Sequence, residues 1–317
     1  MSAAKASAWL SGTGGDIARF FRAMWQRPLA FVGMVVVAVL VLLAIIGPAL
    51  APYDYDQIIR GTDIGLETRR AMTRQPPSEQ FLMGTDQRGR DIYSRMLWGA
   101  RETIGLPLVA TLFSLILGSS LGILLGYLGG VVDDVVSRLL DTLMSIPALV
   151  LALVMISTIV PMLRAAEAPL IDFFGAGNIS LTIVIVILYV PIITRVARSA
   201  TLGVRSAGYI EVARLRGEST AYIMFREILP SVLPALVVEG SLRLSYAIIL
   251  VTSLGFLGLG TRPPTAESGR MVLDARPRML DEPWEIWFPV AAIAILIISV
   301  NLLSDGLRHV LRRDGNQ

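Results

Sequence analysis

The sequence has no cysteine, one lysine and one histidine among its 317 residues. Without cysteine the chain can form no disulfide, no thiolate metal site and no cysteine nucleophile. The one histidine, His309, lies near the C-terminus and excludes a metal site built from several histidines. We therefore expect no catalytic residues and no metal site in this chain, and an enzyme that depends on such groups is disfavoured.

Charged residues are also scarce. They make up 17% of the chain, against roughly a quarter in soluble domains. Hydrophobic residues make up 54%, and the mean hydropathy is +0.65. The net charge of +3 is too small to indicate a polyanionic partner, so we expect no binding of nucleic acid. This composition predicts a protein that crosses the lipid bilayer several times.

Long apolar runs account for this composition. A membrane-spanning helix needs about 20 mostly apolar residues to cross about 30 Å of hydrocarbon. Six stretches meet this requirement, at approximately residues 28–51, 104–128, 139–160, 179–193, 232–259 and 286–304. The expected fold class is therefore an all-α integral membrane protein with six transmembrane helices. An even number of spans places both ends of the chain on the same side of the membrane.

Three local patterns add detail to these spans. Gly118, Gly122 and Gly126 recur at every fourth residue, a spacing that allows close contact with a neighbouring helix. Residues 91–101 carry apolar side chains at helical spacing and predict a helix at the membrane surface before the second span. Pro147 is expected to kink the third span.

The fifth span contains charged residues, which are costly in a membrane and usually face a pathway or a partner. Glu239 and Arg243 are four residues apart, so they share one helix face and can form an ion pair near the middle of the membrane. Either they line a translocation path or its gate, or they form a structural pair against a neighbouring helix. Tyr246 either adds a polar group to that path or bonds within its own helix.

The connection between the fourth and fifth spans, residues 207–230, predicts two short helices joined by a glycine. The first covers about residues 207–216 and ends at Gly217, a position suited to the left-handed backbone that terminates helices. The second begins after Ser219 or the threonine that follows it, both good N-caps, and ends before Pro230. A short, rigid elbow of this kind is suited to docking another protein.

This connection resembles the EAA loop of the permeases of ATP-binding-cassette (ABC) importers. The matching residues are Glu211-Val212-Ala213, Gly217 and Ile228-Leu229-Pro230, with Val212 where the pattern has alanine. In that family the loop inserts a coupling helix into a cleft on the ATP-hydrolysing subunit. The resemblance implies that Glu211 makes polar contacts with that subunit and that Ala213 allows close approach. It further implies that Gly217 sets the bend, with Arg214 as a weaker contact candidate.

Three further segments resemble the dipeptide, oligopeptide and nickel branch of these permeases. They are residues 84–91 with their continuation through 94–95 and 99–101, residues 255–260 with 263–264, and residues 301–308, where Ser304 replaces a more usual glycine. The matches run in order from about residue 28 to residue 308. The resemblance implies the C-type permease of a peptide-class importer, with the fold of type I importer permeases.

The resemblance also implies an organisation of the chain. Its parts are a cytoplasmic N-terminal segment (1–27), a first transmembrane helix (28–51), an extracytoplasmic loop with an interfacial helix (52–103), a core permease domain with five transmembrane helices and the EAA-type loop 207–230 (104–307), and a cytoplasmic tail (308–317). Both termini are expected on the cytoplasmic side of a bacterial inner membrane. The extracytoplasmic loop either helps to receive a binding protein or packs as a lid on a partner permease.

The implied partners are a second homologous permease, two ATPase subunits or one fused chain, an extracytoplasmic substrate-binding protein and the lipid bilayer. The chain has no GxxxxGK[ST] phosphate loop, so ATP and magnesium are expected on the ATPases and no cofactor in this subunit. Peptides are the expected substrate, with nickel or another small solute as the alternative in the same branch. A secondary transporter driven by an ion gradient would predict inverted repeats, which are not visible in the sequence.

Overall fold

The computed structural model describes residues 24–166, 168–260 and 265–314. Within these ranges the chain is mainly helical, with no β-strand beyond two isolated bridges. Six helices are long and apolar enough to cross a membrane, which confirms the predicted all-α membrane fold. They are α2 (Pro28–Leu50), α3 (Ile92–Leu128), α5 (Ala148–Ala165), α7 (Ala176–Val204), α10 (Leu229–Phe256) and α12 (Trp284–Asp314).

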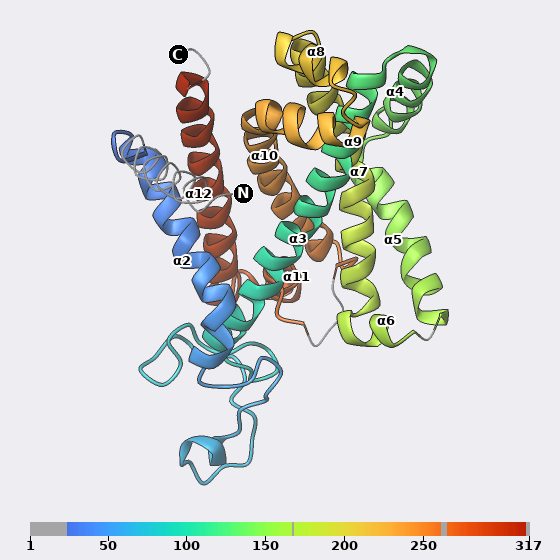
Figure 1. The fold of residues 1–317 in the computed structure, drawn as a ribbon. Coiled ribbons are helices and arrows are strands. Elements are labelled where there is room, and N and C mark those ends of the chain that lie inside the picture. The colour runs from blue at the N-terminus through green and yellow to red at the C-terminus, as the bar shows by residue number, and fades with distance from the viewer. Residues whose placement is uncertain (1–23, 167, 261–264, 315–317) are drawn as a thin grey trace.

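Shorter helices connect these spans and define the two ends of the bundle. They are α4 (Gly130–Met144), α6 (Pro169–Phe174), α8 (Gly208–Leu215), α9 (Thr220–Tyr222), a π-helical segment (Ile223–Ile228) and α11 (Ser268–Ala275). Helices α8 and α4 lie at one end, which we call the α8 end, and residues 51–91 lie at the opposite end, the loop end (Figure 1). Helix α2 begins and α12 ends at the α8 end, as an even number of spans requires (Figure 1).

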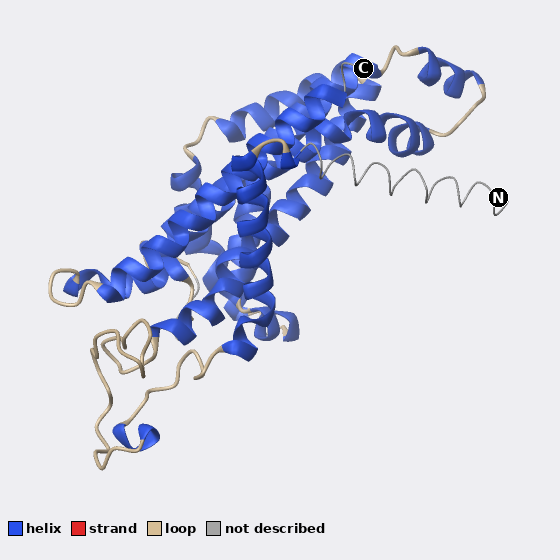
Figure 2. Ribbon diagram, turned by 90° about the vertical axis from the view of Figure 1, so that its left-hand side faces the viewer, coloured by secondary structure: helices blue, strands red, loops and turns tan. Residues whose placement is uncertain are grey.

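Helices α3 and α7 form the centre of the bundle. Helix α3 packs along α7 and also contacts α10 and α2, while α12 packs on α2, α10 and α11. Figure 2 shows the long helices from the side as they run between the two ends. The largest apolar core lies around α3, α7 and α10 and includes Ile123, Val184, Ile193 and Val251. Helix α5 is the most exposed span and packs on α7.

The three glycines of α3 lie against α7, as their spacing predicts. A Cβ atom at Gly118 would lie 2.8 Å from Cβ of Ile193, and one at Gly126 would lie 2.8 Å from Cβ of Thr201. One at Gly122 would lie 2.6 Å from Cβ of an alanine on α7 and would also meet a backbone carbonyl there. The two helices therefore approach so closely that no side chain fits between them at these three positions.

The predicted surface helix at residues 91–101 is not a separate element. Helix α3 is continuous over 37 residues, and the side chain of Asp91 caps its first turn. Two charged side chains of this part of the helix have partners in the structure. Arg95 pairs with Asp86, and Glu102 accepts a hydrogen bond from a threonine hydroxyl before α11. With these contacts the helix continues directly into the apolar span.

The third span begins later than the sequence predicts. Residues 130–144 form the separate helix α4, and the membrane helix α5 starts after Pro147. Pro147 is thus the N-cap of α5 and not a kink within a longer helix, since the residue before a proline avoids helical backbone angles. Helix α4 is held by ion pairs from Asp133 to Arg198 and from Asp141 to a second arginine of α7.

The second helix of the 207–230 connection does not end at Pro230, contrary to the prediction. Its chain runs from α9 through the π-helical segment directly into α10. The backbone N–H of Leu229 donates to the carbonyl of Met224, the longer hydrogen bond of a π turn. The wider π turn just before Pro230 lets the helix continue although proline has no N–H to donate. The connection is therefore joined rigidly to the fifth span.

Candidate functional site

Helix α8 and the glycine after it form a compact elbow at the α8 end. The helix ends at Leu215, and Gly217 adopts a φ of +73°, which confirms the predicted left-handed helix terminus. The N–H of Gly217 donates to the Arg214 carbonyl at 2.9 Å, and the next N–H donates to the Ala213 carbonyl at 3.2 Å. A Cβ at Gly217 would meet no atom within 4 Å. The backbone conformation, and not lack of space, is therefore what requires glycine here.

The two faces of α8 differ in what they contact. Ile210 and Ala213 are buried and pack into the apolar core together with the π-helical segment. Ala213 therefore allows α8 to pack closely on its own chain, and its approach to an ATPase stays a prediction. Glu211 is exposed in the first turn, and Val212 is 51% exposed. The outward face thus presents one carboxylate beside apolar side chains.

Contacts on the sides of α8 fix its position. Arg214 donates through Nε to the hydroxyl of Tyr127 at 3.2 Å, and its guanidinium lies 4.7 Å from the centre of that ring. Tyr209 and Ser231 are 3.0 Å apart through their hydroxyls, which ties α8 to the start of α10. Arg214 therefore anchors the helix to the end of α3, a partner that sequence spacing does not reveal. Leu215, which is 87% exposed, completes the outward face. It lies outside the motif positions, so the sequence does not indicate its role.

Glu239 and Arg243 form the ion pair that their spacing predicts. Nε of Arg243 donates to Oε1 of Glu239 at 2.6 Å, and the two side chains are 17% and 12% exposed. The guanidinium carbon of Arg243 lies 5.1 Å from the ring centre of Tyr246 and 5.8 Å from that of Tyr189. Tyr189 is buried on α7, whereas Tyr246 is 52% exposed. Tyr189 lies on α7, so the spacing of residues along the fifth span does not indicate it.

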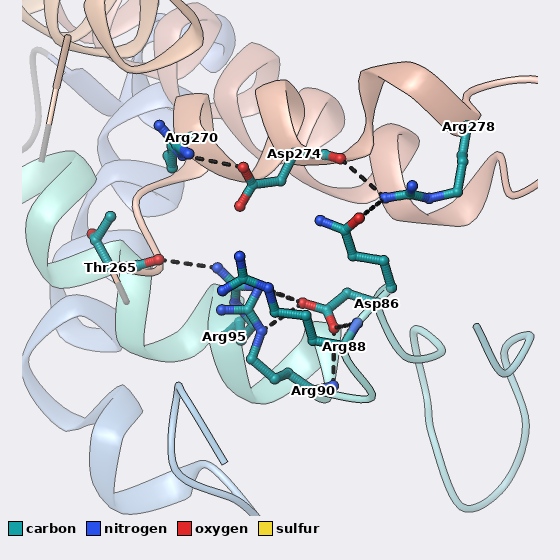
Figure 3. A network of polar contacts seen from close by, with 9 residues as sticks. Asp86, Arg88, Arg90, Arg95, Thr265, Arg270, Asp274 and Arg278 are labelled. Atoms are coloured by element: carbon teal, nitrogen blue, oxygen red, sulfur yellow. Dashed lines mark hydrogen bonds and ion pairs between the residues drawn. The ribbon is translucent and has the colours of Figure 1, made fainter. Parts of the chain in front are cut away.

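At the loop end, a buried polar network centres on Asp86. Its carboxylate accepts hydrogen bonds from Nε of Arg90 at 2.7 Å, from Nη1 of Arg95 at 2.6 Å and from the N–H of Arg88 at 2.8 Å. Arg95 also donates to the carbonyl of Thr265 at 3.0 Å (Figure 3). Burial alone would raise the pKa of Asp86, but the charges of Arg90 and Arg95 together with backbone hydrogen bonds outweigh it and hold that pKa below its ordinary value. The network ties residues 51–91 to α3 and to the segment before α11.

Helix α11 is held by a buried glutamate at its N-cap. Glu267 is 1% exposed, and its two carboxylate oxygens accept from the N–H groups of Gly269 at 2.7 Å and Arg270 at 2.8 Å. A Cβ at Gly255 of α10 would overlap one of these oxygens, so that glycine makes room for the carboxylate. Burial raises the pKa of Glu267 from 4.5 to about 7.

The raised pKa predicts a pH-dependent stability. Between pH 4.5 and about 7 folded Glu267 keeps a proton that the unfolded chain releases, so its contribution is present at low pH and lost as pH rises. Glu267→Gln should remove this dependence, which amounts to on the order of 3 kcal/mol. Thermal unfolding of the purified protein at pH 5 and pH 7.5 measures the difference, with Glu67→Gln in the exposed loop as control. An unchanged pH slope in Glu267→Gln would contradict the assignment.

Within the described residues, no group of three or more histidine, aspartate or glutamate side chains is placed to hold a metal ion. The polar clusters consist of arginine–carboxylate pairs, helix caps and tyrosine contacts. The arrangement suits packing, docking and charge pairing along a helix.

Comparisons with known proteins agree with this geometry. Residues 118–314 match the model of the family described as binding-protein-dependent transport system inner membrane component. Residues 17–77 match the N-terminal transmembrane domain of oligopeptide transport permease C.

Several relatives are similar over most of their length. The dipeptide transport system permease DppC of Alkalihalophilus pseudofirmus is 32% identical over 291 residues, covering 92% of this chain and 88% of that protein. The probable D,D-dipeptide transport system permease DdpC of Escherichia coli is 35% identical over 284 residues, covering 90% and 87%.

A solved structure shares the fold. An inward-facing form of the MetNI methionine ABC transporter includes a chain that aligns with a TM-score of 0.53 at 21% identity, covering 69% of this chain and 95% of that one. Together with the six spans and the elbow after α8, these matches show that the chain belongs to the family of inner-membrane permease components of binding-protein-dependent ABC importers.

Proposed function

We propose that the chain forms one half of the translocation pore of a peptide importer in a bacterial inner membrane. Its partners are a second homologous permease, ATPase subunits as two chains or one fused chain, and an extracytoplasmic binding protein. ATP and magnesium bind to the ATPases, and this subunit holds no cofactor. Identities of 32% and 35% to dipeptide permeases over about nine-tenths of the chain support peptides as the substrate class.

The single observation that carries this proposal is the outward face of α8. Glu211, Val212 and Leu215 are exposed on a short helix whose other side is fixed to α3, α10 and the core. Exposed apolar side chains at the end of a membrane bundle support docking of a soluble partner. The α8 end then lies in the cytoplasm with both termini, and the loop end lies outside. There, residues 51–91 receive the binding protein or contact the partner permease.

A second argument concerns the pore. Ser231, Ala235, Tyr246, Ile249 and Phe256 are exposed on one side of α10, and half-buried residues continue this side between Ala235 and Tyr246. The Glu239–Arg243 pair lies at the edge of this face, within the span. Hydroxyl groups and a charge pair are unfavourable beside lipid tails, so this face supports a lining for a conduit shared with the partner permease.

Reconstitution tests the proposal. The chain, co-expressed with a homologous permease, the ATPases and the binding protein, should purify as one complex and take up peptide into proteoliposomes only with ATP. Uptake should stop when ATP is replaced by a non-hydrolysable analogue. ATP-independent uptake by the chain alone would contradict the proposed function.

A further inference from the structure

We propose that Arg243 binds the C-terminal carboxylate of the peptide during its passage, as a carboxylate site built into α10. Glu239, Tyr189 and Tyr246 hold the guanidinium in place for it. This inference rests on the proposed function and names the group of the substrate that the charged pair recognises.

The guanidinium of Arg243 has donor groups beyond the one that bonds Glu239. Among the described residues, Arg243 donates one side-chain hydrogen bond, from Nε to Glu239. That bond uses Nε and leaves the two terminal nitrogens for another acceptor, and the Arg243 side chain is 17% exposed. These two nitrogens form the planar fork that binds a carboxylate through two parallel hydrogen bonds.

The surrounding side chains hold this fork in one orientation. Glu239 is on the same helix one turn away, and the rings of Tyr246 and Tyr189 lie within 6 Å of the guanidinium carbon. Tyr189 is 5% exposed and rigidly packed on α7, whereas Tyr246 is half exposed on the open face of α10. The site is therefore closed on the α7 side and open on the face that the pore argument assigns to the conduit.

The charge balance suits a peptide in particular. Glu239 and Arg243 cancel, so the empty site brings no net charge into the membrane. A free peptide is a zwitterion with one ammonium and one carboxylate, so the loaded site also stays neutral overall.

The experiment compares tri-alanine with its C-terminal amide in the reconstituted complex, each at a concentration that saturates the binding protein. Glu239→Gln/Arg243→Gln removes both charges together and leaves no lone buried charge. Arg243→Lys keeps the charge and loses the fork. The double variant Asp141→Asn/Arg195→Gln removes an ion pair between α4 and α7 and serves as the matched control.

Both Arg243 variants should lower uptake of the free acid at least about tenfold more than uptake of the amide, as the loss of a charged hydrogen-bonded pair implies. Because each variant is compared with wild type for the same peptide, the preference of the binding protein cancels. The control should leave the ratio of acid to amide unchanged. As a second measurement, the complex without binding protein should bind radiolabelled tri-alanine in wild type and lose this binding in Arg243→Lys.

Equal losses for acid and amide would overturn the inference and leave the conduit assignment standing. Unchanged uptake of both peptides, or unchanged binding of tri-alanine in Arg243→Lys, would also overturn it. Failure of the proposed function is seen separately, as uptake by the wild-type complex that does not require ATP.

Discussion

Replacing Gly122 by leucine is expected to abolish the folded protein. A Cβ at this position would lie 2.6 Å from Cβ of Ala197 and would also meet the carbonyl of Thr194. One of these atoms is a backbone oxygen, and the other is a Cβ carbon, whose position the backbone fixes. Only movement of α7 as a whole could therefore relieve the overlap. Overpacking in a core costs about 1–3 kcal/mol where side chains can adjust, and here they cannot adjust. The helices α3 and α7 should separate.

The same helix supplies a matched control. Gly105 is also inside α3, and a Cβ there would meet nothing within 4 Å. Gly105→Leu should therefore express and unfold like wild type. Fluorescence-detected size exclusion and thermal unfolding in detergent measure both variants. A folded Gly122→Leu protein with the melting temperature of wild type would show that α3 and α7 are not closely packed at this point.

The sequence predicts those features of the fold that depend on one helix and its surroundings. Six apolar runs predict six spans because the bilayer requires each span to bond its own backbone. The glycine spacing of α3 and the pairing of Glu239 with Arg243 follow from the helical repeat alone. Gly217 is recognisable because few residues other than glycine tolerate its left-handed backbone.

Features that depend on partners far apart in the sequence escape prediction. From the sequence, Arg95 is expected at the membrane surface. In the structure it is buried and donates hydrogen bonds to Asp86 and to a carbonyl before α11. The position of the Glu267 carboxylate at its N-cap also depends on a residue far away in the sequence, because Gly255 on α10 leaves room for it.

The same limit applies at the candidate site. Ala213 matches the motif, yet the structure packs it inward, because the face that α8 turns to the core is decided by tertiary contacts. Tyr127 and Tyr189 became recognisable as partners of Arg214 and Arg243 only in three dimensions.

Substitutions in the elbow after α8 are expected to separate folding from coupling. Gly217→Val places a branched side chain at a φ of +73° in open space, so its cost is conformational and on the order of 1 kcal/mol. That is too little to unfold a bundle of six spans, but we expect it to change the angle between α8 and α9, which Gly217 joins. Membrane insertion and pairing with the second permease should persist, while ATPase binding or substrate-stimulated ATP hydrolysis is lost.

Substitutions on the outward face of α8 should also weaken ATPase binding while the permease stays folded. Glu211→Arg reverses the exposed charge, and Leu215→Ser removes an apolar side chain that is 87% exposed and contributes little to the core of its own chain. Neither change touches the inward residues Ile210 and Ala213, so the thermal stability of the permease should be that of wild type. Loss of ATPase co-purification in both variants would identify this face as the contact surface.

The control for this series is Gly203→Val, at an exposed glycine near the end of α7 with open space around it and ordinary helical geometry. It lies at the same end of the bundle, so it separates the effect of the elbow from that of any bulky residue nearby. ATPase co-purification and tri-alanine-stimulated hydrolysis should match wild type in Gly203→Val and fall at least about tenfold in Gly217→Val, a change of about 1.4 kcal/mol in binding. If Gly217→Val, Glu211→Arg and Leu215→Ser all kept both properties, the coupling element would have to lie elsewhere in the chain. The first variant alters the bend, and the other two alter the outward face of α8.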